Sequence, residues 1–123
     1  MPEIESISAV TIFVSSMKRS VAFYESLGFE RRYGGAAADF TSYHVGGGYL
    51  NLAFRAGLES VEIWGRTIFY VRDVDALYAR ARDAGLTAEF EPRDAAWGER
   101  YFHLRDPDGH ELSFAKPLGD RRT

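Results

Sequence analysis

The chain has 123 residues, a length that suits one domain able to bury a core without covalent cross-links. It contains no cysteine, which excludes disulfides, thiolate chemistry and cysteine-based zinc sites. Its net charge of −3, from 15 basic and 18 acidic residues, argues against general nucleic-acid binding, which needs a basic surface. We therefore expect a single domain over residues 1–123 that has no nucleic-acid partner.

The two ends of the chain carry few signals. Residues 1–6 are acidic and lack the basic segment and long apolar run of a signal peptide. We expect no membrane span and a cytoplasmic location. The basic pair Arg121–Arg122 is interpreted as part of a solvated tail over residues 118–123.

The first half of the chain predicts a strand, a helix and three further strands. The first strand covers residues 7–14, and Ser15 or Ser16 can cap the helix that follows. Gly28 ends this helix, and strands are predicted at 29–33, 40–45 and 49–55. The apolar residues of the helix recur at helical spacing, at Met17, Val21, Tyr24 and Leu27. Gly46-Gly47-Gly48 is the predicted turn between the last two strands; no helix or Lys-Ser/Thr follows it, which argues against a phosphate-binding loop.

The second half predicts the same order of elements. A strand at 66–71 precedes a helix that Asp73 can cap and Gly85 ends. Further strands are predicted at 86–90, 100–105 and 110–115. The apolar stripe of the helix is Val74, Leu77, Tyr78, Ala81 and Ala84. Asp106-Pro107-Asp108-Gly109 has the residues of a type I turn and lacks the spaced acids of a calcium loop.

The two halves align at an offset of 57 residues. At this offset Val14 matches Val71, Met17 matches Val74, and Gly28 matches Gly85. An internal repeat decides the fold early. We predict an α+β domain of two tandem βαβββ repeats, about 5–57 and 64–117, whose mixed sheets enclose a cleft.

Alternation along the strands divides the side chains into two faces. The side chains expected to pack under the helices are Val10, Ile12, Val14, Leu52, Phe54, Thr67, Phe69, Val71, Phe102, Leu104, Leu112 and Phe114. The side chains expected to face a ligand are Thr11, Phe13, Asn51, Arg55, Arg66, Tyr70, Tyr101, His103, Glu111 and Ser113. This mixture of aromatic and polar groups is typical of a small-molecule site. The pattern leaves Tyr43 and His44 unplaced.

Three segments of the chain resemble the vicinal-oxygen-chelate superfamily of glyoxalases, bleomycin-resistance proteins and dioxygenases. They are residues 10–29, residues 68–85 and the run Trp97-Gly-Glu-Arg-Tyr-Phe-His-Leu-Arg-Asp-Pro-Asp-Gly-His-Glu-Leu112, which is most similar to the bleomycin-resistance branch. The resemblance covers nearly the whole chain. It implies a homodimer, with strands open to exchange between copies, and a crevice that sequesters a drug.

The resemblance also shows where a metal would bind. Matched by motif, the three ligand positions of metal-using members fall here on Ala9, Arg66 and Ser113. None of these is a usual ligand for Zn²⁺, Mg²⁺, Mn²⁺ or Fe²⁺, and the charge of an arginine repels a cation. We expect no metal and no cofactor.

Several residues allow two interpretations. His103 and Glu111 can act as an acid–base pair, although we favour a polar pair on adjacent strands. Arg66 can bind an anionic ligand group or pair with Glu111. Trp97 can cap the core or form a wall against a ligand, and we favour the wall. His110 is expected to be exposed, and Trp64 can lie at a dimer contact or at the domain edge.

Two functions follow from these observations. The first is a metal-free homodimeric binding protein that sequesters an aromatic or amphipathic molecule, such as an antibiotic. The second is a metal-free enzyme of the same superfamily, an isomerase, cyclase or lyase, that uses acid–base groups such as His103, Glu111 and Tyr70.

Overall fold

A computed structural model describes residues 3–119 of the chain. The chain divides into two compact units, Met1–Glu59 and Ser60–Thr123, and each is described by itself. The boundary falls between the two repeats expected from the sequence. No helix among residues 3–119 is long and apolar enough to cross a membrane. The basic pair Arg121–Arg122 lies outside the described residues.

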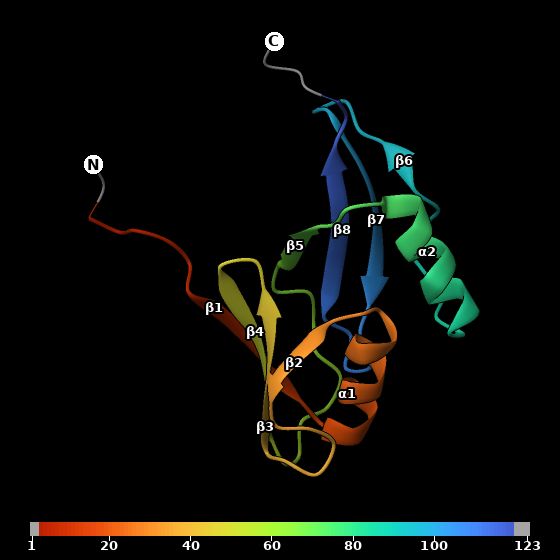
Figure 1. Cartoon of the computed structure of the whole chain (residues 1–123). Helices are drawn as coiled ribbons and strands as arrows, with labels where there is room; N and C mark the ends of the chain where they lie inside the picture. The colour runs from red at the N-terminus through yellow and green to blue at the C-terminus, as the bar shows by residue number, and fades with distance from the viewer. Residues whose placement is uncertain (1–2, 120–123) are drawn as a thin grey trace. The chain divides into compact units, whose positions relative to one another are not determined.

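The first unit is a four-stranded mixed sheet with one helix (Figure 1). Its elements are β1 (Ala9–Val14), α1 (Met17–Ser26), β2 (Glu30–Tyr33), β3 (Phe40–Val45) and β4 (Gly48–Phe54). The strand order is β1-β4-β3-β2, in which β1 runs parallel to β4 and the other neighbours are antiparallel. This is the βαβββ arrangement that the sequence predicts.

Local signals in the sequence set the limits of α1. The Ser16 hydroxyl accepts a hydrogen bond from the Arg19 backbone N–H at 3.2 Å, which caps the first turn. The helix ends where Gly28 adopts a φ of +96°, a conformation that glycine adopts without strain. All four apolar positions of the predicted stripe are buried (Met17, Val21, Tyr24 and Leu27).

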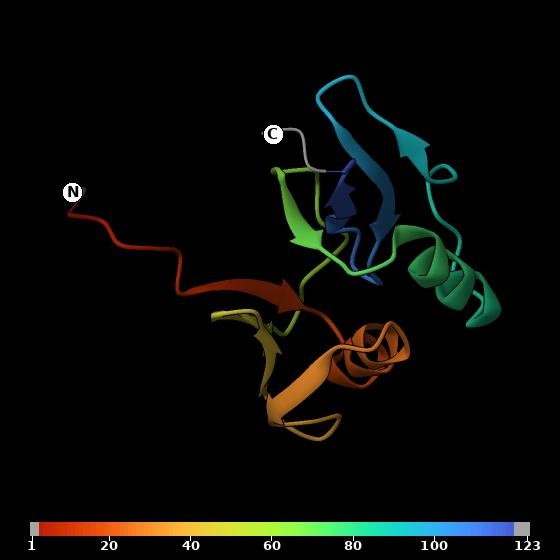
Figure 2. The ribbon, with the colours of Figure 1, turned by 45° about the horizontal axis from the view of Figure 1, so that its top comes forward.

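The second unit repeats this topology (Figure 2). Its elements are β5 (Arg66–Tyr70), α2 (Val74–Asp83), β6 (Arg93–Asp94), β7 (Glu99–Arg105) and β8 (Glu111–Pro117), in the order β5-β8-β7-β6. Helix α2 begins 57 residues after α1, and the Asp73 carboxylate caps it by accepting from the Ala76 N–H at 3.0 Å. The offset read from the sequence is therefore the structural repeat.

The turn between β7 and β8 forms as expected. The Gly109 N–H donates to the Asp106 carbonyl at 2.9 Å, which closes the turn. The Asp106 carboxylate also accepts from the backbone N–H groups of Asp108 and His110, at 3.0 and 2.9 Å. These bonds fix the register in which β7 and β8 pair.

Three expectations about the elements are wrong. Residues 86–90 form no strand; one backbone bond, from the Glu89 N–H to the His103 carbonyl, ties them to β7. Pro92, which has no N–H, interrupts the run, and the short strand β6 follows it. Phe54, expected in the core, is 44% exposed because it is the last residue of β4. Gly48 belongs to β4 rather than to the turn, and a Cβ there would lie 2.6 Å from the Ser8 carbonyl oxygen.

Burial agrees with the predicted alternation at most of the other positions, although Ser113, expected to face a ligand, is buried. Under the helices, the most deeply buried predicted residues are Ile12, Val14, Leu52, Phe69, Phe102, Leu104, Leu112 and Phe114. Tyr43, which the sequence left unplaced, joins this core, and its neighbour His44 points to the opposite face. We call that opposite face of each sheet its helix-free face.

Candidate functional site

The first unit brings together four of the predicted ligand-facing residues. Thr11 lies opposite Asn51 in the β1–β4 register, and the Asn51 side-chain N–H donates to the Thr11 hydroxyl at 3.1 Å. The Arg55 guanidinium lies 4.1 Å from the centre of the Phe13 ring, a cation–π contact. Within residues 3–119, the Asn51 side-chain oxygen is buried and has no hydrogen-bond partner.

Arg32 on β2 is a further residue of this face that the sequence did not indicate. Its guanidinium lies 4.2 Å from the centre of the Tyr49 ring and 5.0 Å from that of Tyr33, and it donates to the Ser42 hydroxyl. The β-bulge between Arg31 and Tyr33 disturbs the alternation in this strand, so parity alone does not place the side chain.

The second unit carries a cluster of charged groups on its helix-free face. Arg66 and Glu111 lie side by side in the β5–β8 register, and two guanidinium nitrogens lie 2.8 and 2.7 Å from Glu111 Oε1. Glu111 is 5% exposed. Burial alone would raise the pKa of its carboxyl, but the hydrogen bonds from Arg66 and Glu89 and the charges of Arg66 and His103 together lower that pKa below its ordinary value. Of the two interpretations of Arg66, the structure shows the internal pair.

His103 and Glu89 complete this cluster. His103 Nδ1 lies 3.7 Å from Glu89 Oε1, and Arg105 donates to Glu89 Oε2 at 2.6 Å. His103 faces Ser113 across the β7–β8 ladder, while Glu111 faces Arg105, so His103 and Glu111 are not directly opposite. Burial and the charge of Arg66 lower the pKa of His103, which keeps the ring neutral at pH 7. A neutral imidazole can accept a proton.

The three superfamily metal positions do not fit a metal. Ala9 and Arg66 offer no ligand atom, and the Ser113 hydroxyl is a poor one. The guanidinium of Arg66 is bound to Glu111 instead. A different trio, Glu89, His103 and Glu111, has potential ligand atoms within 4.8 Å of one another. Arg66 and Arg105 already neutralise its two carboxylates, which opposes binding of a divalent cation.

Aromatic side chains lie beside the charged cluster. The rings of Phe90, Tyr101 and His103 contact one another at centroid distances of 5.0–5.4 Å. Trp97, in the loop before β7, lies 5.4 Å from Tyr101 and is 68% exposed. That exposure excludes the core interpretation of Trp97. Ile68 and Tyr70 on β5 are also exposed, at 58% and 66%.

The expectation that His110 is exposed is wrong. His110 is buried, and its Nδ1 accepts a hydrogen bond from Trp64 Nε1 at 3.1 Å. The segment before β5 covers it, since the Val61 N–H donates to the Asp108 carbonyl at 2.9 Å. Trp64 thus fastens this segment to the β7–β8 turn, although more than half of its surface is exposed.

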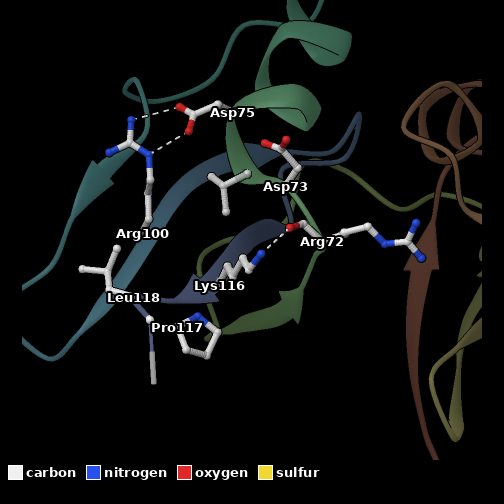
Figure 3. Close-up of a pocket in the computed structure, with 9 residues that line it drawn as sticks. Arg72, Asp73, Asp75, Arg100, Lys116, Pro117 and Leu118 are labelled. Atoms are coloured by element: carbon white, nitrogen blue, oxygen red, sulfur yellow. Dashed lines mark hydrogen bonds and ion pairs between the residues drawn. The ribbon is translucent and has the colours of Figure 1, made fainter. Parts of the chain in front are cut away.

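A pocket at the start of α2 contains none of the predicted site residues (Figure 3). Its charged groups are already bonded: Arg100 to Asp75 at 2.9 Å, and the Lys116 ammonium to the Arg72 carbonyl at 2.9 Å. The Arg72 side chain points away from the pocket (Figure 3). Because this pocket contains none of the predicted site residues, we assign the candidate site to the helix-free face.

In the second unit, the residues that the sequence missed include Glu89, Phe90, Glu99 and Arg105. Glu99 and Arg105 share the parity of Tyr101 and His103, so alternation along β7 was a usable signal. Glu89 and Phe90 lie in a segment that is not a strand, and no periodic pattern indicates which way they point.

The sequence model of the Glyoxalase/Bleomycin resistance protein/Dioxygenase superfamily matches residues 6–114. Uncharacterized proteins of Mycobacterium bovis and Mycobacterium tuberculosis (strain H37Rv) are 44% identical over 48 residues, which are 39% of this chain. The match covers 32% and 28% of those two proteins, so the chain spans only a part of their length.

Solved structures show the same fold at low sequence identity. A bleomycin resistance determinant encoded on the transposon Tn5 is 21% identical, with a TM-score of 0.75 over 92% of this chain and 98% of that one. Lactoylglutathione lyase from Agrobacterium tumefaciens is 19% identical, with a TM-score of 0.74 over 94% and 96% of the two chains. TioX from Micromonospora sp. ML1 is 24% identical, with a TM-score of 0.72 over 93% and 100%. Since the family match spans most of the sequence, the chain belongs to the glyoxalase/bleomycin resistance protein/dioxygenase superfamily.

Proposed function

We propose that this chain is a small-molecule binding protein that sequesters an aromatic or amphipathic ligand, such as an antibiotic, without a metal. The observation that carries the proposal is the exposure of Trp97 beside Tyr101 on the helix-free face of the second unit. Large exposed rings leave apolar surface in contact with water, and a flat ligand that stacks on them buries that surface. A bleomycin resistance determinant is among the structural neighbours, which supports the same class of function.

A thermal-shift screen against antibiotics and aromatic metabolites tests this function. A ligand present at 100 times its dissociation constant stabilises the fold by about 2.7 kcal/mol. In a Trp64→Phe background, Trp97 is the remaining indole, and a ligand that stacks on it quenches its fluorescence. Trp97→Ala then weakens binding by about 1–3 kcal/mol, as for an interface aromatic.

Trp64→Phe is also the matched control, because Trp64 is exposed but bonded to His110 rather than to the aromatic group around Tyr101. It leaves the affinity unchanged. Normal binding by a folded Trp97→Ala variant would place the ligand elsewhere and overturn the site assignment.

A second candidate function is proton transfer, favoured by a neutral His103 whose Nδ1 lies 3.7 Å from Glu89 Oε1. An isomerase or lyase of this kind removes a proton from an acidic C–H of its ligand. NMR of each screening hit in D₂O detects this as exchange of that hydrogen for deuterium. Catalytic exchange that is lost in His103→Gln supports an enzymatic function. If no bound hit exchanges its hydrogen, the binding function is supported instead.

A further inference from the structure

On the helix-free face of the second unit, the carboxylate of Glu99 lies between two aromatic side chains and forms no ion pair within the described residues. Its Oε2 accepts a hydrogen bond from the Tyr70 hydroxyl, and its Oε1 accepts one from Trp97 Nε1 at 3.1 Å. Both donors are neutral. Within residues 3–119 no lysine, arginine or histidine pairs with Glu99, whereas Asp75, Asp94, Glu89 and Glu111 each pair with an arginine.

The two donors do not cancel this charge. The hydrogen bond to Glu99 is the main cause that raises the pKa of Tyr70, so the phenol stays protonated and neutral at physiological pH. The indole N–H of Trp97 is a neutral donor and does not neutralise the carboxylate. A full negative charge therefore remains between two side chains that are each about two-thirds exposed.

Three arginines lie on the same face as Glu99, and within the described residues none of them forms an ion pair with it. Arg93 lies 3.5 Å from the centre of the Phe90 ring and 6.0 Å from that of Tyr101. Arg66 and Arg105 are paired with Glu111 and Glu89. Within residues 3–119 Glu99 is thus a carboxylate without a cationic partner, whereas Arg66, which could have bound an anionic group, is paired with Glu111.

We propose that Glu99, Tyr70 and Trp97 form a binding site for an organic cation, an alkylammonium group carried on an aromatic or amphipathic molecule. A carboxylate attracts the cation, and aromatic faces attract it through their quadrupoles, which is how aromatic cages hold quaternary ammonium ions. The apolar part of the same molecule stacks on Trp97. This inference rests on the proposed binding function and specifies the chemical class of its ligand.

Three soluble probes that share a phenyl ring and differ in charge test the charge preference: benzyltrimethylammonium, benzyl alcohol and phenylacetate. The indole N–H resonance of Trp97, assigned with Trp97→Phe, reports binding in the ¹⁵N-labelled protein. Benzyltrimethylammonium binds most tightly and phenylacetate most weakly. Glu99→Gln keeps a hydrogen-bond acceptor but removes the charge, and it weakens the cation by about tenfold while benzyl alcohol is unaffected.

Glu91→Gln is the matched control, since it removes the same charge from an exposed position in the same unit. It leaves all three affinities unchanged. If the three probes bind equally, or Glu99→Gln and Glu91→Gln weaken the cation to the same degree, the cation site is overturned. In that case benzyl alcohol binding to Trp97→Ala is measured from the NMR signals of the alcohol itself: its loss still supports the aromatic site, and its retention overturns both proposals.

Discussion

Arg66 stands at a superfamily metal position and forms an ion pair with Glu111. Its guanidinium provides both short contacts to Glu111 Oε1, and the next arginine, Arg105, lies 3.8 Å from the other oxygen. Because Glu111 is buried, removing its main donor leaves a poorly compensated charge. We expect Arg66→Ala to lower the free energy of unfolding by about 1–3 kcal/mol in urea denaturation.

The double variant Arg66→Ala/Glu111→Gln separates this effect from loss of packing. Neutralising the carboxylate removes the unpaired charge, so the double variant recovers part of the lost stability. A double variant as unstable as the sum of its two single changes would show that the pair contributes nothing by itself.

His103 makes the stability of the second unit depend on pH. Its folded pKa is lowered by burial and by Arg66, against the opposing charges of Glu111 and Glu89, with a smaller lowering by Arg93. The unfolded chain, with an ordinary pKa of about 6.5, therefore binds a proton first as the pH falls. The stability that neutral His103 contributes to folding is fully present above about pH 6.5 and is lost as the pH falls below that value.

Urea denaturation at pH 7.5 and 5.5 measures this dependence. His103→Gln flattens the change between the two values, while His44→Gln, at an exposed position of the first unit, preserves it. A wild-type chain equally stable at both values would contradict the assignment.

At the scale of elements, the two serines before α1 differ in their partners: Ser16 caps the helix backbone, and Ser15 bonds a side chain. Ser16 accepts from the Arg19 backbone, whereas Ser15 receives a 3.4 Å contact from the Arg19 side chain. We expect Ser16→Ala to lower the free energy of unfolding by about 1 kcal/mol. Ser15→Ala is the control because the Ser15 hydroxyl bonds the Arg19 side chain and not the helix backbone, and equal losses for the two variants in urea would contradict the cap.

The elements that the sequence predicts correctly are those whose signals are local. Ser16 and Asp73 begin the helices and Gly28 and Gly85 end them through contacts within four residues. The segment 86–90 fails because its apolar residues suit a strand, while its pairing depends on β7 and on the proline that follows. A short apolar run does not reveal whether a partner strand accepts it.

At the scale of the whole molecule, an uncharged edge strand favours self-association. β1 lies at the edge of its sheet, and its sequence AVTIFV has none of the charges that protect edge strands from pairing. We expect a homodimer, with twice the chain mass of 13.9 kDa in sedimentation at micromolar concentration. A single species of one chain mass across the concentration range would contradict this.

We also expect the purified protein to retain no stoichiometric metal after dialysis, and a chelator to leave its melting temperature unchanged. The superfamily positions lack donors, and the carboxylates of Glu89 and Glu111 are neutralised by arginines. Elemental analysis that finds zinc, manganese, nickel or iron near one per chain would contradict this. Loss of that metal in His103→Gln would then locate it at the alternative trio.

The sequence by itself determined the repeat, the helix limits and the two faces of most strands, because periodicity and caps act over a few residues. It left Trp97 as either a cap over the core or a wall against a ligand. Only the tertiary structure decided which charges neutralise one another. Arg66 and Glu111 are 45 residues apart, and Tyr70 and Glu99 are 29 apart, so their pairing depends on how β5, β7 and β8 assemble. That assembly buries His110, draws Glu89 toward His103 and leaves Glu99 without a cationic partner in the described chain.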